Sequence, residues 1–156
     1  MKKPSDASSN STPKLPDQPV IFVDEALGRH VIADALRAAG ARVEVHADHF
    51  MSGERDEIWL AEVAARDWIV LSKDLRIRYR GLALRAIERS LARVFVLKRS
   101  EDLTGPEMAA IFVRALPAIY RKAGDPFPPF IAKVGKDGNV VHWWPTRPRR
   151  SRKRVK

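Results

Sequence analysis

Short apolar runs alternate with amphipathic segments through the middle of this chain. Continuous runs of β-branched and aromatic residues are typical of buried strands, and apolar residues repeated every three or four positions are typical of helices. The expected strands are residues 20–23, 43–45, 68–71 and 94–97, and the expected helices between them are 31–39, 55–66 and 82–91. This alternation requires parallel strands joined by right-handed crossovers, so the pattern predicts an α/β fold.

The C-terminal third of the chain departs from this alternation. A Thr-Gly-Pro-Glu sequence at 104–107 matches a helix start, with a capping residue, a proline in the first turn and an acid three residues after the cap. We expect Pro117 to kink or shorten this helix, because proline lacks the N–H that the helix needs. Apolar runs at 130–134 and 140–144 then flank a Lys-Asp-Gly-Asn sequence, which predicts a C-terminal β-hairpin.

Two of the predicted strands are followed by a carboxylate. Asp24 comes directly after residues 20–23, and Asp74 comes three residues after residues 68–71. Neighbouring parallel strands end at the same edge of a sheet, where open α/β sheets bind their ligands. A third acid, Asp56, lies in the first turn of an expected helix, which the topology brings to the same edge. The sequence therefore predicts one acidic site.

Three carboxylates packed together repel one another and raise each other's pKa unless a cation neutralises them. A site made only of oxygen ligands favours Mg²⁺ or Mn²⁺ over zinc, and such ions keep waters that can meet substrate phosphates. A metal held there could orient a water for in-line attack on a phosphodiester and stabilise the leaving oxygen. This chemistry is that of a metal-dependent nuclease.

Each acid also has a structural explanation. Asp24 could cap a helix or turn, Asp56 could interact with the helix macrodipole, and Asp74 could fix the turn after its strand. The occurrence of two strand-end acids and a helix-start acid in one β-α-β series favours the functional explanation.

Basic residues follow the same strand end. Lys73, Arg76 and Arg78 could hold phosphates beside the metal, since ammonium and guanidinium groups pair with phosphodiester oxygens. The alternative is that they are solvated surface charges.

Two further groups of residues have weaker chemical readings. His46, Asp48 and His49 could ligate a transition metal, but the sequence supplies no convincing further ligand. Trp143 and Trp144 could stack on bases, although residues on alternate faces of a terminal strand more simply pack on a core.

Composition sets the outer limits of these readings. The chain has 156 residues, which is enough for one domain with a core. It has no cysteine, which excludes disulfides, thiolate zinc sites and cysteine nucleophiles. The absence of cysteine also fits a cytoplasmic protein. No apolar run is long enough to span a membrane. The formal net charge is +10, which favours polyanionic partners. Residues 1–18 are expected to be a disordered leader and residues 146–156 a basic disordered tail.

Several segments in fixed order resemble the PIN-like domain family, in particular the toxin nucleases of bacterial toxin–antitoxin pairs. The segments are FVDEALG at 22–28, VEVHADHF at 43–50, DEIWL at 56–60, WIVLSKDLRI at 68–77 and PFIA at 129–132. The resemblance covers residues 20–144, within an expected domain at 19–145. It implies a three-layer α/β sandwich with a mostly parallel central sheet.

The resemblance also implies a ribonuclease activity. Asp24, Asp56 and Asp74 would hold Mg²⁺ or Mn²⁺ and act in catalysis. The resemblance favours Arg76 as a substrate-binding residue, and the positive charge of Lys73 makes it a second candidate for binding the RNA. Such a toxin would have an antitoxin protein and a second copy of the chain as partners. It would act in the cytoplasm and would have no membrane partner.

One feature of the family pattern is missing. Many PIN nucleases present a fourth acid after the next strand, whereas residues 94–97 here run into Lys98-Arg-Ser. Glu57 and Asp48 are candidates to complete the cluster, and Glu101 and Asp102 lie a little further along.

Two other functions remain open on the sequence alone. A receiver-type phosphoacceptor domain has an acid pair after its first strand and an aspartate after its third, which Asp24, Glu25 and Asp74 loosely match. A non-catalytic module with the same fold would bind nucleic acid in a salt-dependent way without cutting it.

Overall fold

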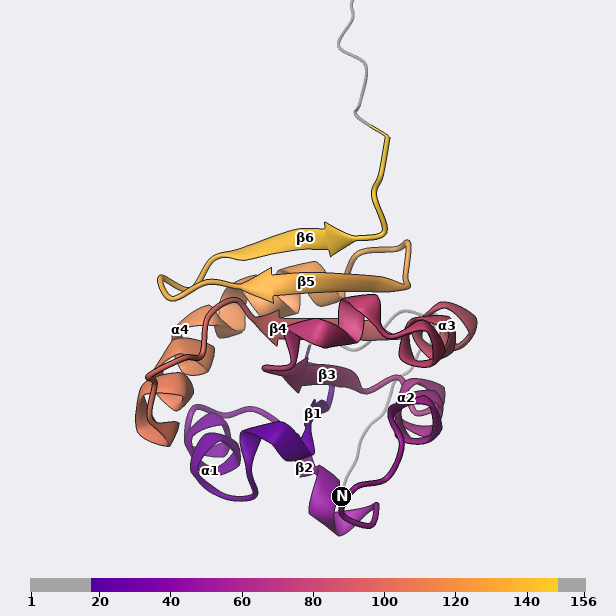
Figure 1. Ribbon diagram of the computed structural model, residues 1–156. Coiled ribbons are helices and arrows are strands. Elements are labelled where there is room, and N and C mark those ends of the chain that lie inside the picture. Colours follow the sequence, from indigo (N-terminus) through magenta and orange to yellow (C-terminus); the bar gives the residue numbers. More distant parts are fainter. Residues whose placement is uncertain (1–17, 149–156) are drawn as a thin grey trace, which may run out of the picture.

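The computed structural model describes residues 18–148 as a central sheet between two layers of helices (Figure 1). The order of the six strands across the sheet is β2-β1-β3-β4-β5-β6. The first five are parallel to one another, and β6 is antiparallel to β5. The strands are β1 (Ile21–Val23), β2 (Val43–Val45), β3 (Ile69–Ser72), β4 (Arg93–Leu97), β5 (Phe130–Val134) and β6 (Val140–Trp144).

Four α-helices cover the two faces of this sheet. Helix α1 packs beside α4 on one face, and α2 packs beside α3 on the other (Figure 1). Their bounds are α1 (Val31–Ala38), α2 (Asp56–Ala65), α3 (Gly81–Ser90) and α4 (Gly105–Ala123). Short 3₁₀ helices follow three of the strands, namely η2 (Glu25–Leu27), η3 (His46–Asp48) and η4 (Leu75–Tyr79). The predicted three-layer α/β sandwich is therefore confirmed.

The central strands are apolar at nearly every position because both of their faces are buried. In β1, Ile21 and Val23 join the core under α1 and α4, whereas Phe22 between them joins the core under α2 and α3. Strand β3 repeats this division, with Leu71 on the first face and Val70 on the second. A continuous apolar run is what a parallel strand with two covered faces requires.

Helix α4 differs from its prediction at one point. The capping box is present as expected, with Thr104 and Glu107 each accepting a hydrogen bond from the other's backbone. Pro117 was expected to kink or shorten the helix, but the helix continues through it to Ala123. Pro117 lies on the exposed side of the helix, and the stripe of buried residues that packs α4 on the sheet continues on both sides of it. The prediction of shortening is wrong for this reason.

The expected hairpin is also confirmed, since β5 and β6 pair antiparallel around a turn in which Gly138 has a φ of 91°. The predicted leader and most of the predicted tail lie outside the described residues. Arg147, which was assigned to the tail, donates hydrogen bonds to the side chain of Asp125 and the backbone of Phe127. No helix within residues 18–148 is long and apolar enough to cross a membrane.

Candidate active site at the carboxyl edge of the sheet

Asp24 and Asp74 lie together because β1 and β3 are neighbours in the sheet. Ser72, the last residue of β3, donates from Oγ to Oδ2 of Asp24 over 2.7 Å. The same Oγ accepts the backbone N–H of Asp74 at 3.1 Å. One buried hydroxyl therefore ties the two strand ends to each other, as the common edge of parallel strands predicts.

Asp56 reaches this edge from the first turn of α2. Its Oδ1 accepts a hydrogen bond from Nε1 of Trp59 at 3.1 Å, which holds the carboxylate against its own helix. The other oxygen, Oδ2, accepts a hydrogen bond from Nη1 of Arg80 at 2.7 Å. The carboxylate is thus held on one side by a buried indole and on the other by a cation.

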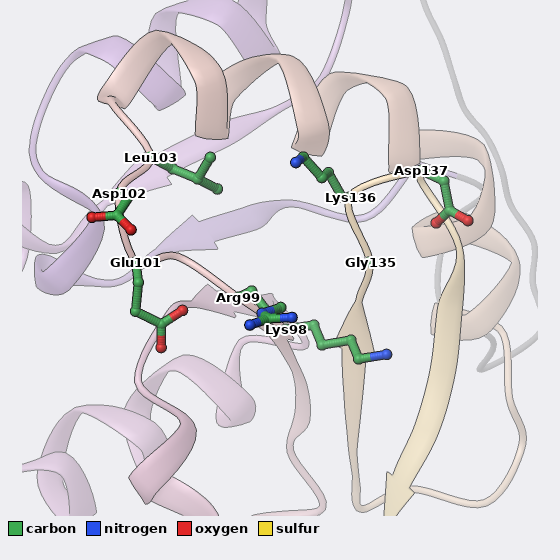
Figure 2. Close-up of a pocket in the computed structure, with 8 residues that line it drawn as sticks. All are labelled: Lys98, Arg99, Glu101, Asp102, Leu103, Gly135, Lys136 and Asp137. Carbon is green, nitrogen blue, oxygen red and sulfur yellow. The ribbon is translucent and has the colours of Figure 1, made fainter.

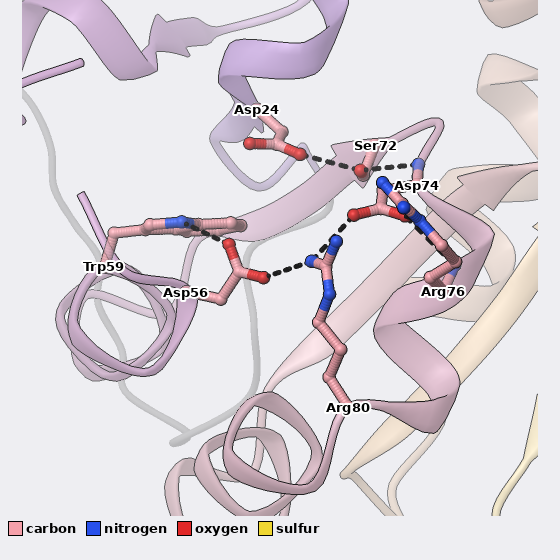
Figure 3. A network of polar contacts seen from close by, with 7 residues as sticks. All are labelled: Asp24, Asp56, Trp59, Ser72, Asp74, Arg76 and Arg80. Carbon is pink, nitrogen blue, oxygen red and sulfur yellow. Dashed lines mark hydrogen bonds and ion pairs between the residues drawn. The ribbon is translucent and has the colours of Figure 1, made fainter. Parts of the chain in front are cut away.

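Arg80 is shared between two of the acids. Its Nη1 lies 2.7 Å from Oδ2 of Asp56 and 2.8 Å from Oδ2 of Asp74. Figure 3 shows the guanidinium between these two carboxylates, with Asp24 on the far side of Ser72. A single basic side chain therefore bridges α2 and the end of β3.

Asp24 has a different electrostatic environment from its two neighbours. It is 8% exposed, and burial raises the pKa of its carboxyl above the usual value, with the nearby Asp56 raising it further. The hydrogen bond from Ser72 opposes this rise in pKa only in part. A buried carboxylate with a raised pKa gains more than an exposed one from a nearby cation.

The three predicted acids fit a hard metal ion by chemistry but are not arranged around one here. Residues 18–148 contain no group of three or more histidines and carboxylates that could hold a metal as they lie. The donor set nevertheless fits, because oxygens of Asp56 and Asp74 already converge on one cationic nitrogen and the buried Asp24 lies beside them. Arg80 occupies the position between the acids.

The other residues predicted for this site divide into two groups. Arg76 donates to Oδ1 of Asp74 from its backbone N–H at 3.0 Å and from Nε at 3.4 Å, and the half-buried Lys73 adjoins Asp74 in the chain. Glu57 is not brought to the acids. Its carboxylate lies 3.6 Å from Arg55, and the residue lines a groove between α2 and α3.

The histidine motif does not form a metal site either. His46 is buried, with its ring against Phe22 and Trp59, whereas Nε2 of His49 binds Glu44 at 2.7 Å. Asp48 is exposed. The transition-metal alternative therefore finds no support in the described residues.

A cavity of about 590 Å³ lies further along the same edge, between the end of β4 and the β5–β6 turn. Glu101 and Asp102 line one side of it, and Lys136 and Asp137 line the other (Figure 2). These two acids thus belong to a cavity of mixed charge with Lys98 and Arg99, not to the cluster around Asp24.

Sequence reasoning missed two residues of the site. Ser72 had a readable signal, since it is the first polar residue after an apolar strand and precedes a strand-end acid. Arg80 had no such signal beyond its place in an Arg-rich segment, because the packing of α2, η4 and α3 determines its contacts with Asp56 and Asp74. The aromatic pair had the simpler explanation, because Trp143 and Trp144 are partly buried against the core under α2 and α3.

Comparison with known proteins identifies the class to which this fold and acidic edge belong. Residues 19–99 match the model of the family described as PIN like domain, and the chain belongs to this family. The chain is also 32% identical over 118 residues to "Putative ribonuclease VapC45" of Mycobacterium tuberculosis (strain ATCC 25618 / H37Rv), a match that covers 73% of this chain and 85% of that protein. No solved structure matches the chain.

Family membership also counts against one of the alternatives left open above. The receiver-type domain is set aside, because the chain belongs to the PIN-like family and Glu25, its proposed second acid, accepts hydrogen bonds from Ser52 and from the backbone of Gly53.

Proposed function

We propose that this protein is a Mg²⁺- or Mn²⁺-dependent endoribonuclease and the toxin of a toxin–antitoxin pair. The relative named a putative ribonuclease supports the reaction, and its VapC name supports the toxin role. One observation carries the proposal. Asp24 and Asp74 are linked by hydrogen bonds through Ser72 at the edge of the sheet, and Arg80 pairs Asp56 with Asp74.

Asp24, Asp56 and Asp74 would hold the ion, which when bound supplies a polarised water for attack on the phosphodiester and charge to stabilise the leaving oxygen. Ser72 and Trp59 position the site, because the hydroxyl of Ser72 donates to Asp24 and the indole N–H of Trp59 donates to Asp56. Arg76 and Lys73, beside Asp74, would bind phosphate oxygens of the RNA.

The net charge of +10 suits an RNA substrate, and RNA cleavage would place the enzyme in the cytoplasm. An antitoxin that neutralises the toxin and a second copy of the chain are the protein partners of this proposal. Expression of the chain alone should arrest bacterial growth. Coexpression of its small antitoxin should relieve the arrest, and the antitoxin should copurify with the chain.

Cleavage of mixed RNA and DNA in the presence of Mg²⁺, Mn²⁺ or EDTA tests the reaction. Asp74→Asn should lower the rate about a hundredfold or more, because it removes a metal oxygen and disturbs the positioned water. Asp34→Asn is the matched control, since Asp34 is an exposed acid on α1 that lies 3.7 Å from Arg37. Unchanged RNA cleavage by Asp74→Asn would refute the site assignment.

A non-catalytic nucleic-acid-binding module is the second candidate, and the bridging of Asp56 and Asp74 by Arg80 favours it. Such a module would bind RNA equally well in EDTA, would lose affinity steeply as salt is raised, and would cut nothing. The same assay, run with a filter-binding measurement beside it, separates the two functions.

A further inference from the structure

Arg80 is the one cation, among residues 18–148, that lies within ion-pair distance of two of the site carboxylates. A single nitrogen, Nη1, makes both contacts, at 2.7 Å to Asp56 and 2.8 Å to Asp74. Arg76 also reaches Asp74, but its Nε lies 3.4 Å away and its side chain is 80% exposed, and within the described part of the chain it pairs with no second acid. The two arginines therefore differ in how they hold the site.

Nη1 lies between the carboxylates of Asp56 and Asp74. A divalent ion held by both carboxylates would need space between them and would be repelled by the positive guanidinium. Binding of the ion would therefore require the side chain of Arg80 to move away.

The contacts of Arg80 are also of a kind that can be released. Its side chain is 41% exposed, and ion pairs with access to solvent contribute little net stability because water screens the charges. Its backbone lies between the end of η4 and the start of α3, so the side chain can turn toward solvent without disturbing a buried contact of a helix interior.

We propose that Arg80 is a positioning residue that holds Asp56 and Asp74 together in the metal-free protein and is displaced by the divalent ion. This inference rests on the proposed metal-dependent function. In the metal-free protein the guanidinium neutralises two of the three acids at this edge, which would otherwise repel each other. The apparent affinity of the acids for metal is then their intrinsic affinity multiplied by the fraction of molecules in which Arg80 is already displaced.

Titration of the full chain with Mn²⁺, followed by calorimetry, tests the proposal without any need for turnover. Arg80→Gln should bind Mn²⁺ about tenfold more tightly than the wild type, because no side chain competes for the oxygens. Arg76→Gln is the matched control. It removes a positive charge from the same carboxylate without breaking a bridge, so its affinity should change by no more than about threefold if competition, rather than net charge, is the cause.

A second measurement needs no substitution. The Nε–Hε signal of Arg80 in the wild-type protein, followed by NMR, should move toward the position of a free guanidinium as Mg²⁺ is added. The Arg76 signal should move less, since only the Arg80 bridge must open.

The outcomes separate this inference from the proposed function. If Arg80→Gln binds Mn²⁺ no more tightly than the wild type or Arg76→Gln, and the Arg80 signal is unmoved while Asp74→Asn loses metal binding, Arg80 does not compete with the ion and the nuclease assignment stands. Absence of Mn²⁺ binding from every variant, together with absence of RNA cleavage, would overturn both.

Discussion

Two aspartates with little exposure, at opposite edges of the sheet, have pKa values shifted in opposite directions. Asp24, at the carboxyl edge, is 8% exposed and receives its side-chain hydrogen bond from the neutral hydroxyl of Ser72. Asp125, in the loop that leads into β5, has a side chain 12% exposed and is held by Lys122 and Arg147, each at 2.8 Å. Burial raises the pKa of Asp24. At Asp125 burial acts in the same direction, but the two cations and the backbone N–H of Phe127 outweigh it and lower the pKa far below its usual range.

The comparison separates an acid whose charge is neutralised within the fold from an acid whose charge is not. Two cations neutralise Asp125, and Arg147 is thereby held against the loop that leads into β5. Asp24 is buried without a paired cation among the described residues, and its neighbours Asp56 and Asp74 share Arg80. An acid that is buried and incompletely neutralised is typical of functional sites, whereas a fully paired acid is typical of structural ones.

The largest expected contrast is in the response to metal. Mn²⁺ at about a hundred times its dissociation constant should raise the free energy of unfolding of the wild type by about 2.7 kcal/mol, because the ion binds only the folded protein. Asp125→Asn should show the same rise, and Asp24→Asn should show almost none. Thermal unfolding with and without Mn²⁺ measures both, and an equal rise in the two variants would remove the distinction between the two aspartates.

Loss of the Asp125 carboxylate should have the next largest effect. Asp125→Asn should lower the free energy of unfolding by about 2 kcal/mol without metal, because it weakens charge-assisted hydrogen bonds and leaves Lys122 with less compensation. Urea unfolding measures the change. Asp137→Asn is the control, since Asp137 is exposed and accepts hydrogen bonds from the nearby Asn139 in the hairpin turn. A loss as large as that of Asp125→Asn would refute the assignment.

The smallest effect is in the dependence of stability on pH, where the two acids should act in opposite directions. The folded pKa of Asp125 lies far below the usual value of an aspartate, so its stabilisation is present above about pH 4 and is lost as the pH falls. The folded pKa of Asp24 lies above 3.8, so its contribution is full below that pH and is lost as the pH rises through the folded pKa.

In metal-free protein, Asp24→Asn should therefore be more stable than the wild type near pH 7, and the gain should disappear in acid. For Asp125→Asn the deficit should be present near pH 7 and should shrink in acid. Unfolding curves collected from pH 3 to pH 8 in EDTA test both signs, and slopes of the same sign for the two variants would show that the pKa directions are misassigned.

The sequence by itself determined the parts of the molecule that depend on neighbours in the chain. An apolar run followed by an acid is a local pattern, and it was enough to predict β1, β3 and the edge at which Asp24 and Asp74 meet. The cap at Thr104 and the hairpin turn at Gly138 are equally local, because the chemistry of a cap or a turn lies within four residues.

Only the tertiary structure decided which side chains pair across the site. Ser72 is 48 residues from Asp24, and Arg80 is 24 residues from Asp56, so no spacing rule links them. Glu57 follows Asp56 directly, yet one step along a helix turns a side chain by about 100°, which sends it to the groove between α2 and α3. Likewise, Pro117 is tolerated because packing leaves it on the exposed side of α4. Hydrophobic periodicity specifies which face of an element is buried, but the partner of a charged group is chosen by the distances that packing creates.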